Sequence, residues 1–285
     1  MNKKQKSEPE KSYHKHQTPL DETRLMIYFY KKTNKEEKME FKDLGLSDAT
    51  IQAIVEFGIK QPTTVQADVI PAVLEGKDIF TIAPQRSGKT YSYVLPLIDV
   101  IAKTKNQNIL ILTADSWQAS NVSDSFAIFN KYHNDEDAED TSNVIIATPN
   151  LVLELAAEEK IDLSKTHILV VDDINLIKKK HQLANLEQIL EKLPAEKQNI
   201  VFTNRRSKET QSILDKILKT PTEIKVDKNK VDEADLAPKA DPVQSFEAKK
   251  MLSEPDKESL NLVQKYHIFG DKTPRYLLIK GELKS

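Results

Sequence analysis

The octet Ala83–Thr90, which reads Ala-Pro-Gln-Arg-Ser-Gly-Lys-Thr, constrains the fold more than any other stretch of this chain. β-Branched and apolar residues over 78–82 predict a short strand before it, and apolar residues at helical spacing over 91–102 predict a helix after it. A loop between strand and helix is where phosphate-binding loops occur, because backbone N–H groups and the helix N-terminus there face an anion. The sequence therefore predicts an α/β fold with a phosphate site at this loop.

Two residues at the end of the octet have specific expected roles. Lys89 is predicted to reach the terminal phosphates, and the Thr90 hydroxyl is predicted to hold Mg²⁺. The strict pattern begins with glycine, where this chain has Ala83. The alternative is a lysine-rich helix start after an ordinary turn, and the predicted strand and helix on either side favour the phosphate loop.

Composition excludes several classes of protein. The 285 residues include no cysteine, which removes disulfides and thiolate metal sites. The formal net charge is −2, so a nucleic-acid surface would have to be a local basic patch. The apolar runs are too short to span a bilayer, and the basic N-terminus is not followed by an apolar secretion segment, so we expect a soluble cytoplasmic protein with no membrane partner.

Two helices are expected before the loop. Ser47 is predicted to cap the first helix, which extends through Phe57 and ends at Gly58. Thr63 is predicted to cap the second, and the Gln66 amide offers a donor and an acceptor together, which fits an adenine edge. Alternatively, the segment around Gln66 is an ordinary turn before a helix. The apolar face of the first helix is expected to comprise Ile51, Ile54 and Val55.

Over residues 41–226 the chain resembles the first RecA-like domain of DEAD-box RNA helicases. The resemblance is carried by four features that occur in the order and spacing of that domain, namely Phe41 and the segments 58–66, 76–78 and 83–90. The resemblance implies a RecA-like phosphate-loop NTPase fold, with a mostly parallel sheet and helices on both faces. It also implies ATP and Mg²⁺ as cofactors. The residues that it assigns to ATP are Phe41, Ile59, Gln66, Ala83, Arg86, Ser87, Gly88, Lys89 and Thr90.

The nucleotide motifs depart from the family pattern at two positions. Ile59 stands where the family usually has an aromatic ring against the base, and Arg86 stands where it has glycine. The Arg86 side chain could crowd the phosphates or reach toward them as an extra cation. The resemblance still assigns adenine contact to Gln66, with Phe41 packed beside the base.

The strand expected over 166–171 delivers two aspartates to the carboxyl end of the sheet, the edge at which parallel α/β folds bind ligands. The resemblance places Asp172 on Mg²⁺ and puts Asp173 where the family has the glutamate that activates the attacking water. The aspartate side chain is shorter, and a displacement of about 1 Å can reduce a rate on the order of a hundredfold. The alternative is an aspartate pair that caps the next turn.

A second set of departures concerns the residues that couple ATP chemistry to RNA in the family. This chain has Asn175 and residues 203–205 in their place, which predicts that the coupling network is lost or rewired.

The RNA motifs are the most degenerate. Residues 114–119 stand where the family has Pro-Thr-Arg-Glu-Leu-Ala, and only the final alanine is kept. Trp117 could stack on a base, but we expect it to be a helix anchor packed against the sheet. Thr148 and Pro149 resemble the start of the family's Thr-Pro-Gly-Arg, which implies an RNA phosphate contact, although a helix start explains them equally well. We expect Arg205 and Arg206 to face solvent rather than to pair with Asp173.

Four segments are expected along the chain. Residues 1–38 read as a charged flexible tail, with a nucleic-acid-binding arm as the alternative. Residues 39–226 form the RecA-like ATP-binding domain, which contains a short acidic link over 131–142. Residues 227–260 read as a polar linker, and 261–285 as a strand-like remnant of a second RecA-like domain.

Three functions are compatible with these motifs. The first is a helicase N-terminal domain that binds ATP–Mg²⁺ and RNA, with hydrolysis and unwinding weak or absent in this chain alone and a protein partner supplying or replacing the second domain. The second is a nucleotide-binding pseudoenzyme whose shape is read by a protein partner. The third is an unrelated phosphate-loop kinase or ATPase, which leaves the pattern from Phe41 to Gln66 unexplained.

Overall fold

A computed structural model of the chain describes residues 39–104, 106–133 and 143–226. The predictions for the tail, the polar linker, the C-terminal remnant and most of the acidic link fall outside these ranges. Within them, no helix is long and apolar enough to cross a membrane.

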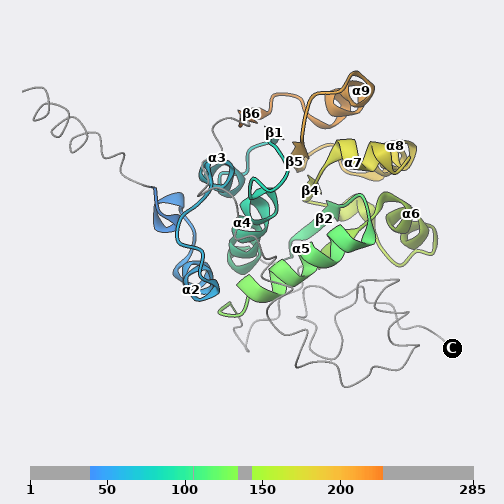
Figure 1. The fold of residues 1–285 in the computed structure, drawn as a ribbon. Coiled ribbons are helices and arrows are strands. Elements are labelled where there is room, and N and C mark those ends of the chain that lie inside the picture. The colour runs from blue at the N-terminus through green and yellow to red at the C-terminus, as the bar shows by residue number, and fades with distance from the viewer. Residues whose placement is uncertain (1–38, 105, 134–142, 227–285) are drawn as a thin grey trace, which may run out of the picture. The chain divides into compact units, whose positions relative to one another are not determined.

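A six-stranded sheet in the order β3-β2-β4-β5-β1-β6 forms the centre of the described residues (Figure 1). All five neighbouring pairs are parallel. The strands are β1 (Ile79–Ile82), β2 (Asn108–Leu112), β3 (Asn143–Ala147), β4 (Ile168–Val171), β5 (Gln198–Thr203) and β6 (Thr222–Lys225). Apolar runs in the sequence predict strands over 78–82, 108–113, 143–147, 166–171, 199–202 and 222–226. Each of these six predictions is confirmed, with differences of at most two residues at either end.

The central strands β1, β2, β4 and β5 are buried on both faces, as is usual for parallel sheets, whereas the edge strand β6 is mostly exposed. In β2, Ile109 and Ile111 join one hydrophobic cluster, whereas Leu110 and Leu112 join the other. This alternation follows from the two-residue period of a strand. Continuous apolar runs in the sequence therefore correspond to strands that have helices packed against both of their faces.

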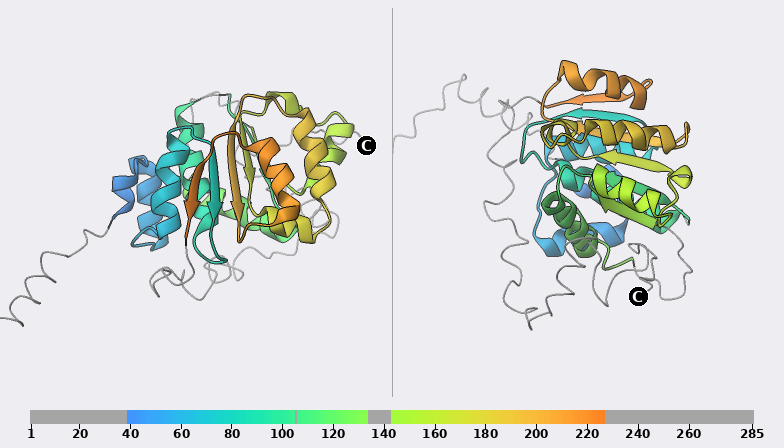
Figure 2. Two further views of the ribbon diagram at one scale, coloured as in Figure 1. Left: turned by 90° about the horizontal axis from the view of Figure 1, so that it is seen from above. Right: turned by 90° about the vertical axis from the view of Figure 1, so that its right-hand side faces the viewer.

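Helices cover the two faces separately (Figure 2). One face, called the α4 face here, carries η1 (Phe41–Leu44), α2 (Asp48–Phe57), α3 (Thr64–Leu74), α4 (Lys89–Lys103) and α5 (Ser116–Phe129). The opposite face carries α6 (Pro149–Ala157), η2 (Leu163–Lys165), α7 (Ile174–Lys179), α8 (Leu183–Lys192) and α9 (Lys208–Ile217). The arrangement confirms the predicted RecA-like α/β fold.

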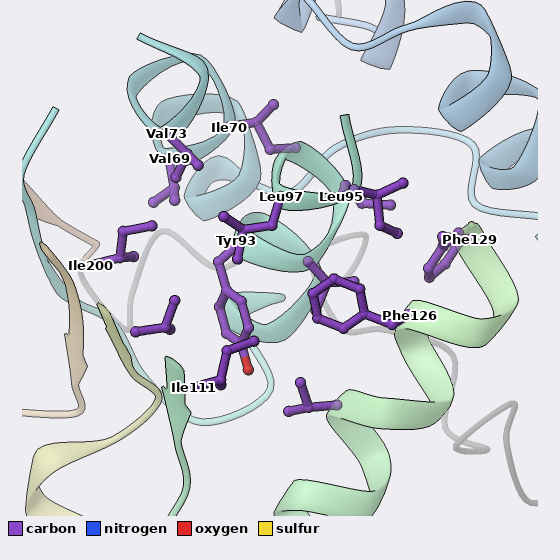
Figure 3. Packing of buried hydrophobic residues seen from close by; sticks show 14 of the residues in the cluster. Val69, Ile70, Val73, Tyr93, Leu95, Leu97, Ile111, Phe126, Phe129 and Ile200 are labelled. Atoms are coloured by element: carbon purple, nitrogen blue, oxygen red, sulfur yellow. The ribbon is translucent and has the colours of Figure 1, made fainter. Parts of the chain in front are cut away.

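Helix α4 is the best-buried helix of the α4 face, with an unbroken run of buried residues from Ser92 to Asp99. Full burial of each Leu or Ile side chain contributes about 1.5 to 3 kcal/mol. This packing fixes the helix that begins directly after the phosphate loop. The surrounding side chains in Figure 3 are Val69, Ile70 and Val73 of α3, Phe126 and Phe129 of α5, and Ile111 and Ile200 of the sheet.

The predicted starts and stops of α2 and α3 are confirmed. Ser47 accepts a hydrogen bond from the Thr50 N–H, and Gly58 ends α2 in the left-handed region with φ 86°. The prediction for Val55 was wrong, because this side chain is 69% exposed whereas Ile54 is buried. Successive helical residues are rotated by about 100°, so Val55 lies outside the face that Ile54 presents to the core.

A buried carboxylate joins α2 to α4. Asp99 is fully buried and accepts hydrogen bonds from the Ser47 N–H at 2.5 Å, the Ser47 hydroxyl at 2.7 Å and the Thr50 hydroxyl at 2.5 Å. His133 Nε2 lies 3.4 Å from the same carboxylate. A buried charge is tolerated only when it is paired and hydrogen-bonded, and these partners meet that requirement.

Candidate nucleotide site

The phosphate loop connects β1 to α4 and closes around a lysine. Lys89 Nζ donates to the carbonyl oxygens of Ala83 at 3.1 Å and Pro84 at 3.0 Å. The buried Ser87 hydroxyl also donates to the Pro84 carbonyl, at 2.8 Å. The ammonium group is therefore held inside the loop by acceptors that an incoming phosphate would have to replace.

Gly88 is needed at its position for two separate reasons. Its φ of 85° lies in the left-handed region, and a Cβ atom there would approach Gln66 Nε2 and Thr63 Oγ1 to 2.7 Å. The Thr63 hydroxyl donates to the Ser87 carbonyl at 2.9 Å, and Gln66 Nε2 donates to the Gly88 carbonyl at 3.3 Å. The start of α3 is thus bonded directly to the phosphate loop.

Gln66 also belongs to a capping box that our sequence analysis missed. Its Oε1 accepts from the Thr63 N–H at 2.9 Å, and the Thr63 hydroxyl accepts from the Gln66 N–H. The Thr-x-x-Gln spacing is a known signal for this box and could have revealed it. Gln66 is 3% exposed, and its amide keeps one N–H and one lone pair outside these bonds.

The other residues expected around the base and phosphates differ in exposure. Phe41 is buried in the core of the α4 face, and Ile59 is half-buried against that core. Arg86 is exposed and has a φ of 63°, a left-handed conformation that is unfavourable for a residue with a Cβ atom. The expected ATP contacts of these three residues stay predictions.

An acidic pair faces the loop lysine from the end of β4. Asp172 and Asp173 are 6% and 3% exposed. Burial raises the pKa of Asp172 to about 6 and also raises the pKa of Asp173, while the positive charge of Lys89 opposes both shifts. Burial lowers the pKa of Lys89, and the two carboxylates oppose that shift. The structure therefore brings these three predicted site residues together.

Asp173 also caps α7. Its Oδ1 accepts from the Asn175 N–H at 3.0 Å and from the Leu176 N–H at 3.3 Å. This is the capping role that our sequence analysis gave as the alternative to a hydrolytic one. The carboxylate is oriented by two backbone donors, both of which bind the same oxygen.

The network that was predicted to be lost or rewired is rewired. Asn175 Nδ2 donates to Thr203 Oγ1 at 2.8 Å, Asn204 Oδ1 at 3.1 Å and the Arg205 carbonyl at 2.7 Å. The Thr203 hydroxyl also donates to the Arg205 carbonyl at 2.8 Å. A single buried amide thus joins the start of α7 to the segment after β5.

The structure contradicts the interpretation of Trp117 as an anchor against the sheet. Trp117 lies in the first turn of α5 and is 61% exposed. The buried side of this helix carries Ala119, Val122 and Phe126. Trp117 precedes Ala119 by two residues, a rotation of about 200°, so the indole projects from the opposite side.

The remaining residues on the predicted RNA side have local structural roles. Thr148 caps α6 by accepting from the Leu151 N–H, and Pro149 is the first residue of that helix. Arg205 is exposed, as expected. Arg206 is half exposed but forms an ion pair with Glu223, and its guanidinium lies 5.3 Å from the centre of the Phe80 ring. The expected phosphate contact of Thr148 and Pro149 stays a prediction.

The donor set suits Mg²⁺ only together with a nucleotide. Over the described ranges, three or more His, Cys, Asp or Glu side chains nowhere gather as a metal cluster. The Thr90 hydroxyl and the Asp172 carboxylate are oxygen donors, which Mg²⁺ prefers, and Mg²⁺ commonly takes its remaining ligands from phosphates and water. The residues present therefore fit a magnesium ion that arrives with phosphate oxygens.

An all-parallel sheet with a phosphate loop after β1 and an acidic pair after β4 defines the class of RecA-like α/β domains. The model of the DEAD/DEAH box helicase family matches residues 63–212, which is just over half of the 285 residues. The chain belongs to this family, as its motifs predicted.

Similar proteins include two bacterial helicases. The DEAD-box ATP-dependent RNA helicase RhpA of Helicobacter pylori (strain B128) is 26% identical over 214 residues, which cover 70% of this chain and 44% of that protein. The ATP-dependent RNA helicase DeaD of Buchnera aphidicola subsp. Acyrthosiphon pisum is 28% identical over 206 residues, which cover 66% of this chain and 34% of that protein. The chain spans less than half the length of these relatives.

Two solved structures have the same fold. A DEAD box protein from the hyperthermophile Methanococcus jannaschii superposes with a TM-score of 0.62 at 24% identity, covering 67% of this chain and 57% of that one. A hypothetical ATP-dependent RNA helicase from Sulfolobus tokodaii gives a TM-score of 0.56 at 22% identity, covering 64% and 57%. These likenesses support the fold assignment.

Proposed function

We propose that this chain is an ATP–Mg²⁺-binding domain of a DEAD-box RNA helicase, with hydrolysis and strand separation weak or absent in the chain alone. The observation that carries the proposal is the grouping of Lys89, Asp172 and Asp173, whose charges influence one another across the phosphate loop. Family membership supplies the nucleotide and the nucleic acid as the expected ligands.

Binding of the phosphates requires a local exchange of hydrogen bonds. Lys89 Nζ leaves the carbonyls of Ala83 and Pro84 and turns toward the phosphate oxygens. Backbone N–H groups at the start of α4 face the same anion. Gln66 recognises adenine with the N–H and the lone pair that its bonds to Thr63 and Gly88 leave available.

Thr90 and Asp172 would hold Mg²⁺, which would neutralise charge on the phosphates. Asp173 orients the attacking water through the carboxylate oxygen that does not cap α7. Its side chain is one methylene shorter than glutamate and is held by two backbone donors, so we expect slow hydrolysis.

RNA binding is the weaker half of the proposal. Thr148 and Pro149 are the residues that we expect to meet a phosphate, and Thr148 already uses its hydroxyl as a helix cap. Asp115 replaces a neutral residue of the family motif and carries a charge that repels phosphate. We therefore propose that RNA binds weakly, and that a protein partner supplies or replaces the second domain.

A nucleotide-binding pseudoenzyme is the second candidate. One observation favours it: the Asn175 amide donates hydrogen bonds to all three residues from Thr203 to Arg205, so their acceptors find a partner within this domain. If these residues stay bonded to one another in all nucleotide states, ATP chemistry is uncoupled from RNA. The chain would then serve as a nucleotide-dependent surface for a protein partner.

Calorimetry of ATP binding with Mg²⁺, followed by phosphate release with and without single-stranded RNA, tests both candidates. We expect measurable binding that Lys89→Ala abolishes, whereas Lys103→Ala, at an exposed lysine in the last turn of the same helix, leaves it unchanged. RNA-stimulated release supports a helicase domain, and binding without release supports the pseudoenzyme. Equal ATP affinity in Lys89→Ala and the parent would refute the proposed site.

A further inference from the structure

The Tyr93 side chain contains a buried polar atom without a partner. Tyr93 is 0% exposed, and its hydroxyl oxygen has no hydrogen-bond partner among the described residues. Buried polar groups are nearly always paired, because an unpaired one loses its hydration and receives nothing in return. An exception next to a ligand site therefore calls for a specific explanation.

Tyr93 lies about one helical turn after Thr90, which is one of the two residues proposed to hold magnesium. It follows Thr90 by three residues on α4, so the two side chains lie on the same side of the helix. The ring packs against Phe202 with centroids 5.4 Å apart, and the side chain extends from α4 toward the sheet with its oxygen at the far end (Figure 3). Packing therefore fixes the direction in which the hydroxyl points.

The polar groups next to the phenol are those of the proposed metal site. Burial raises the pKa of Tyr93 well above its usual value, and the adjacent Asp172 carboxylate raises it further, whereas the Thr90 hydroxyl lowers it. The mutual electrostatic influence of Tyr93 and Asp172 places the hydroxyl close to the carboxylate, although it meets full hydrogen-bond geometry with no group among the described residues.

We propose that the Tyr93 hydroxyl is a positioning group for the magnesium site, which donates to one Asp172 oxygen when Mg²⁺ and ATP are bound and so directs the other oxygen to the ion. This inference rests on the proposed function. Carboxylates that bind metals are usually oriented by such outer hydrogen bonds, and loss of the outer partner typically lowers metal affinity by 10- to 100-fold. Tyr93 acts through Asp172 and does not touch the ion.

The variant Tyr93→Phe removes the hydroxyl and keeps the ring. We expect about tenfold more Mg²⁺ to be needed for half-maximal ATP binding by calorimetry, and no change in ATP affinity in EDTA. In EDTA its melting temperature should equal or exceed that of the parent, because an unpaired hydroxyl is lost. In the parent, we expect Mg²⁺–ATP binding to change the tyrosine absorbance, and we expect this change to be absent from Tyr93→Phe.

Thr81→Val is the matched control. Thr81 in β1 also has a buried hydroxyl without a partner in the described part of the chain, and it does not act on Asp172. We expect the melting temperature of Thr81→Val to equal or exceed that of the parent, as in Tyr93→Phe. The Mg²⁺ concentration needed for half-maximal ATP binding should stay at the parent's value. In an Asp172→Asn background, Tyr93→Phe should have no further effect on that dependence.

Equal Mg²⁺ dependence in Tyr93→Phe and the parent would overturn this inference while leaving the proposed function intact. A tenfold effect that persists in the Asp172→Asn background would also overturn it, because the hydroxyl would then act through another group. A parent chain that binds no ATP at any Mg²⁺ concentration would overturn the proposed function, and this inference with it.

Discussion

The two sides of the candidate site differ in how their polar groups are held. On the nucleotide side, the side chains of Thr63, Gln66 and Lys89 bind the backbone of the phosphate loop or of their own helix start. On the predicted RNA side, Trp117 is 61% exposed and Thr148 makes only a helix cap. The phosphate loop is therefore held by side chains from α3 and α4. The RNA side is held at the start of α5, where Gln182 donates to the Ala114 carbonyl and Lys180 pairs with Asp115, and the Trp117 side chain stays exposed.

Gly88→Ala tests whether the close contact between α3 and the loop is essential, and we expect it to have the largest effect. The new Cβ atom would lie 2.7 Å from Gln66 Nε2 and Thr63 Oγ1, in a left-handed conformation. We expect ATP affinity to fall about a hundredfold by calorimetry, because strain of about 1 to 2 kcal/mol at this φ adds to the cost of moving Gln66 and Thr63 away from the loop. Gly76→Ala is the control, because its φ is also positive but no atom lies within 4 Å. Equal losses in both variants would mean that backbone strain alone is responsible.

The acidic pair predicts how stability depends on pH. The pKa of Asp172 is raised from 3.8 to about 6, so the folded chain holds this proton more tightly than the unfolded chain. The contribution of this group to stability therefore rises as pH falls from about 6 to about 4, by about 2 to 3 kcal/mol. In EDTA, Asp172→Asn should be more stable than the parent at pH 7, and this advantage should shrink as the pH falls from about 6 to about 4. Urea unfolding at several pH values measures it.

Asp215→Asn, at an exposed aspartate of α9, controls for the change in net charge. A difference between Asp172→Asn and the parent that stays constant from pH 4 to pH 7 would contradict the prediction. That outcome would mean that the buried carboxylate is stabilised to the same degree in both charge states.

Asn175→Asp tests the rewired network. The amide donates to Thr203 Oγ1, Asn204 Oδ1 and the Arg205 carbonyl, and a carboxylate cannot donate to any of them. We expect a loss of about 2 kcal/mol in the free energy of unfolding, because the shared amide donor is lost and a charge is buried in its place. Asn150→Asp, at an exposed site, should change it by less than about 0.5 kcal/mol. A stable Asn175→Asp variant would show that this segment can rearrange.

Trp117→Ala should have the smallest effect. The side chain is mostly exposed, so we expect the free energy of unfolding to change by less than about 0.5 kcal/mol and ATP affinity to stay the same. Phe126→Ala on the buried side of the same helix should cost about 3 to 5 kcal/mol. Chemical denaturation compares the two variants, and a large loss in Trp117→Ala would point to a contact that the structure does not contain.

Much of the fold could be predicted from local sequence. The six strands, the caps at Ser47 and Thr63 and the loop between β1 and α4 all follow from the residue types and their spacing. The errors arose where the direction of a side chain depends on helix rotation and packing. Val55 and Trp117 are apolar, yet both lie outside the buried faces of their helices.

The sequence by itself determined the strand–loop–helix unit at Ala83–Thr90 and the family motifs, because these depend on residues that are neighbours along the chain. Tertiary structure alone decided which distant groups meet. Asp99 finds its partners about 50 residues away, and the Tyr93 hydroxyl comes to lie beside Asp172 without pairing. The physical reason is that the hydrogen bonding of a buried polar atom depends on how helices and sheet pack, and spacing along the chain does not contain that information.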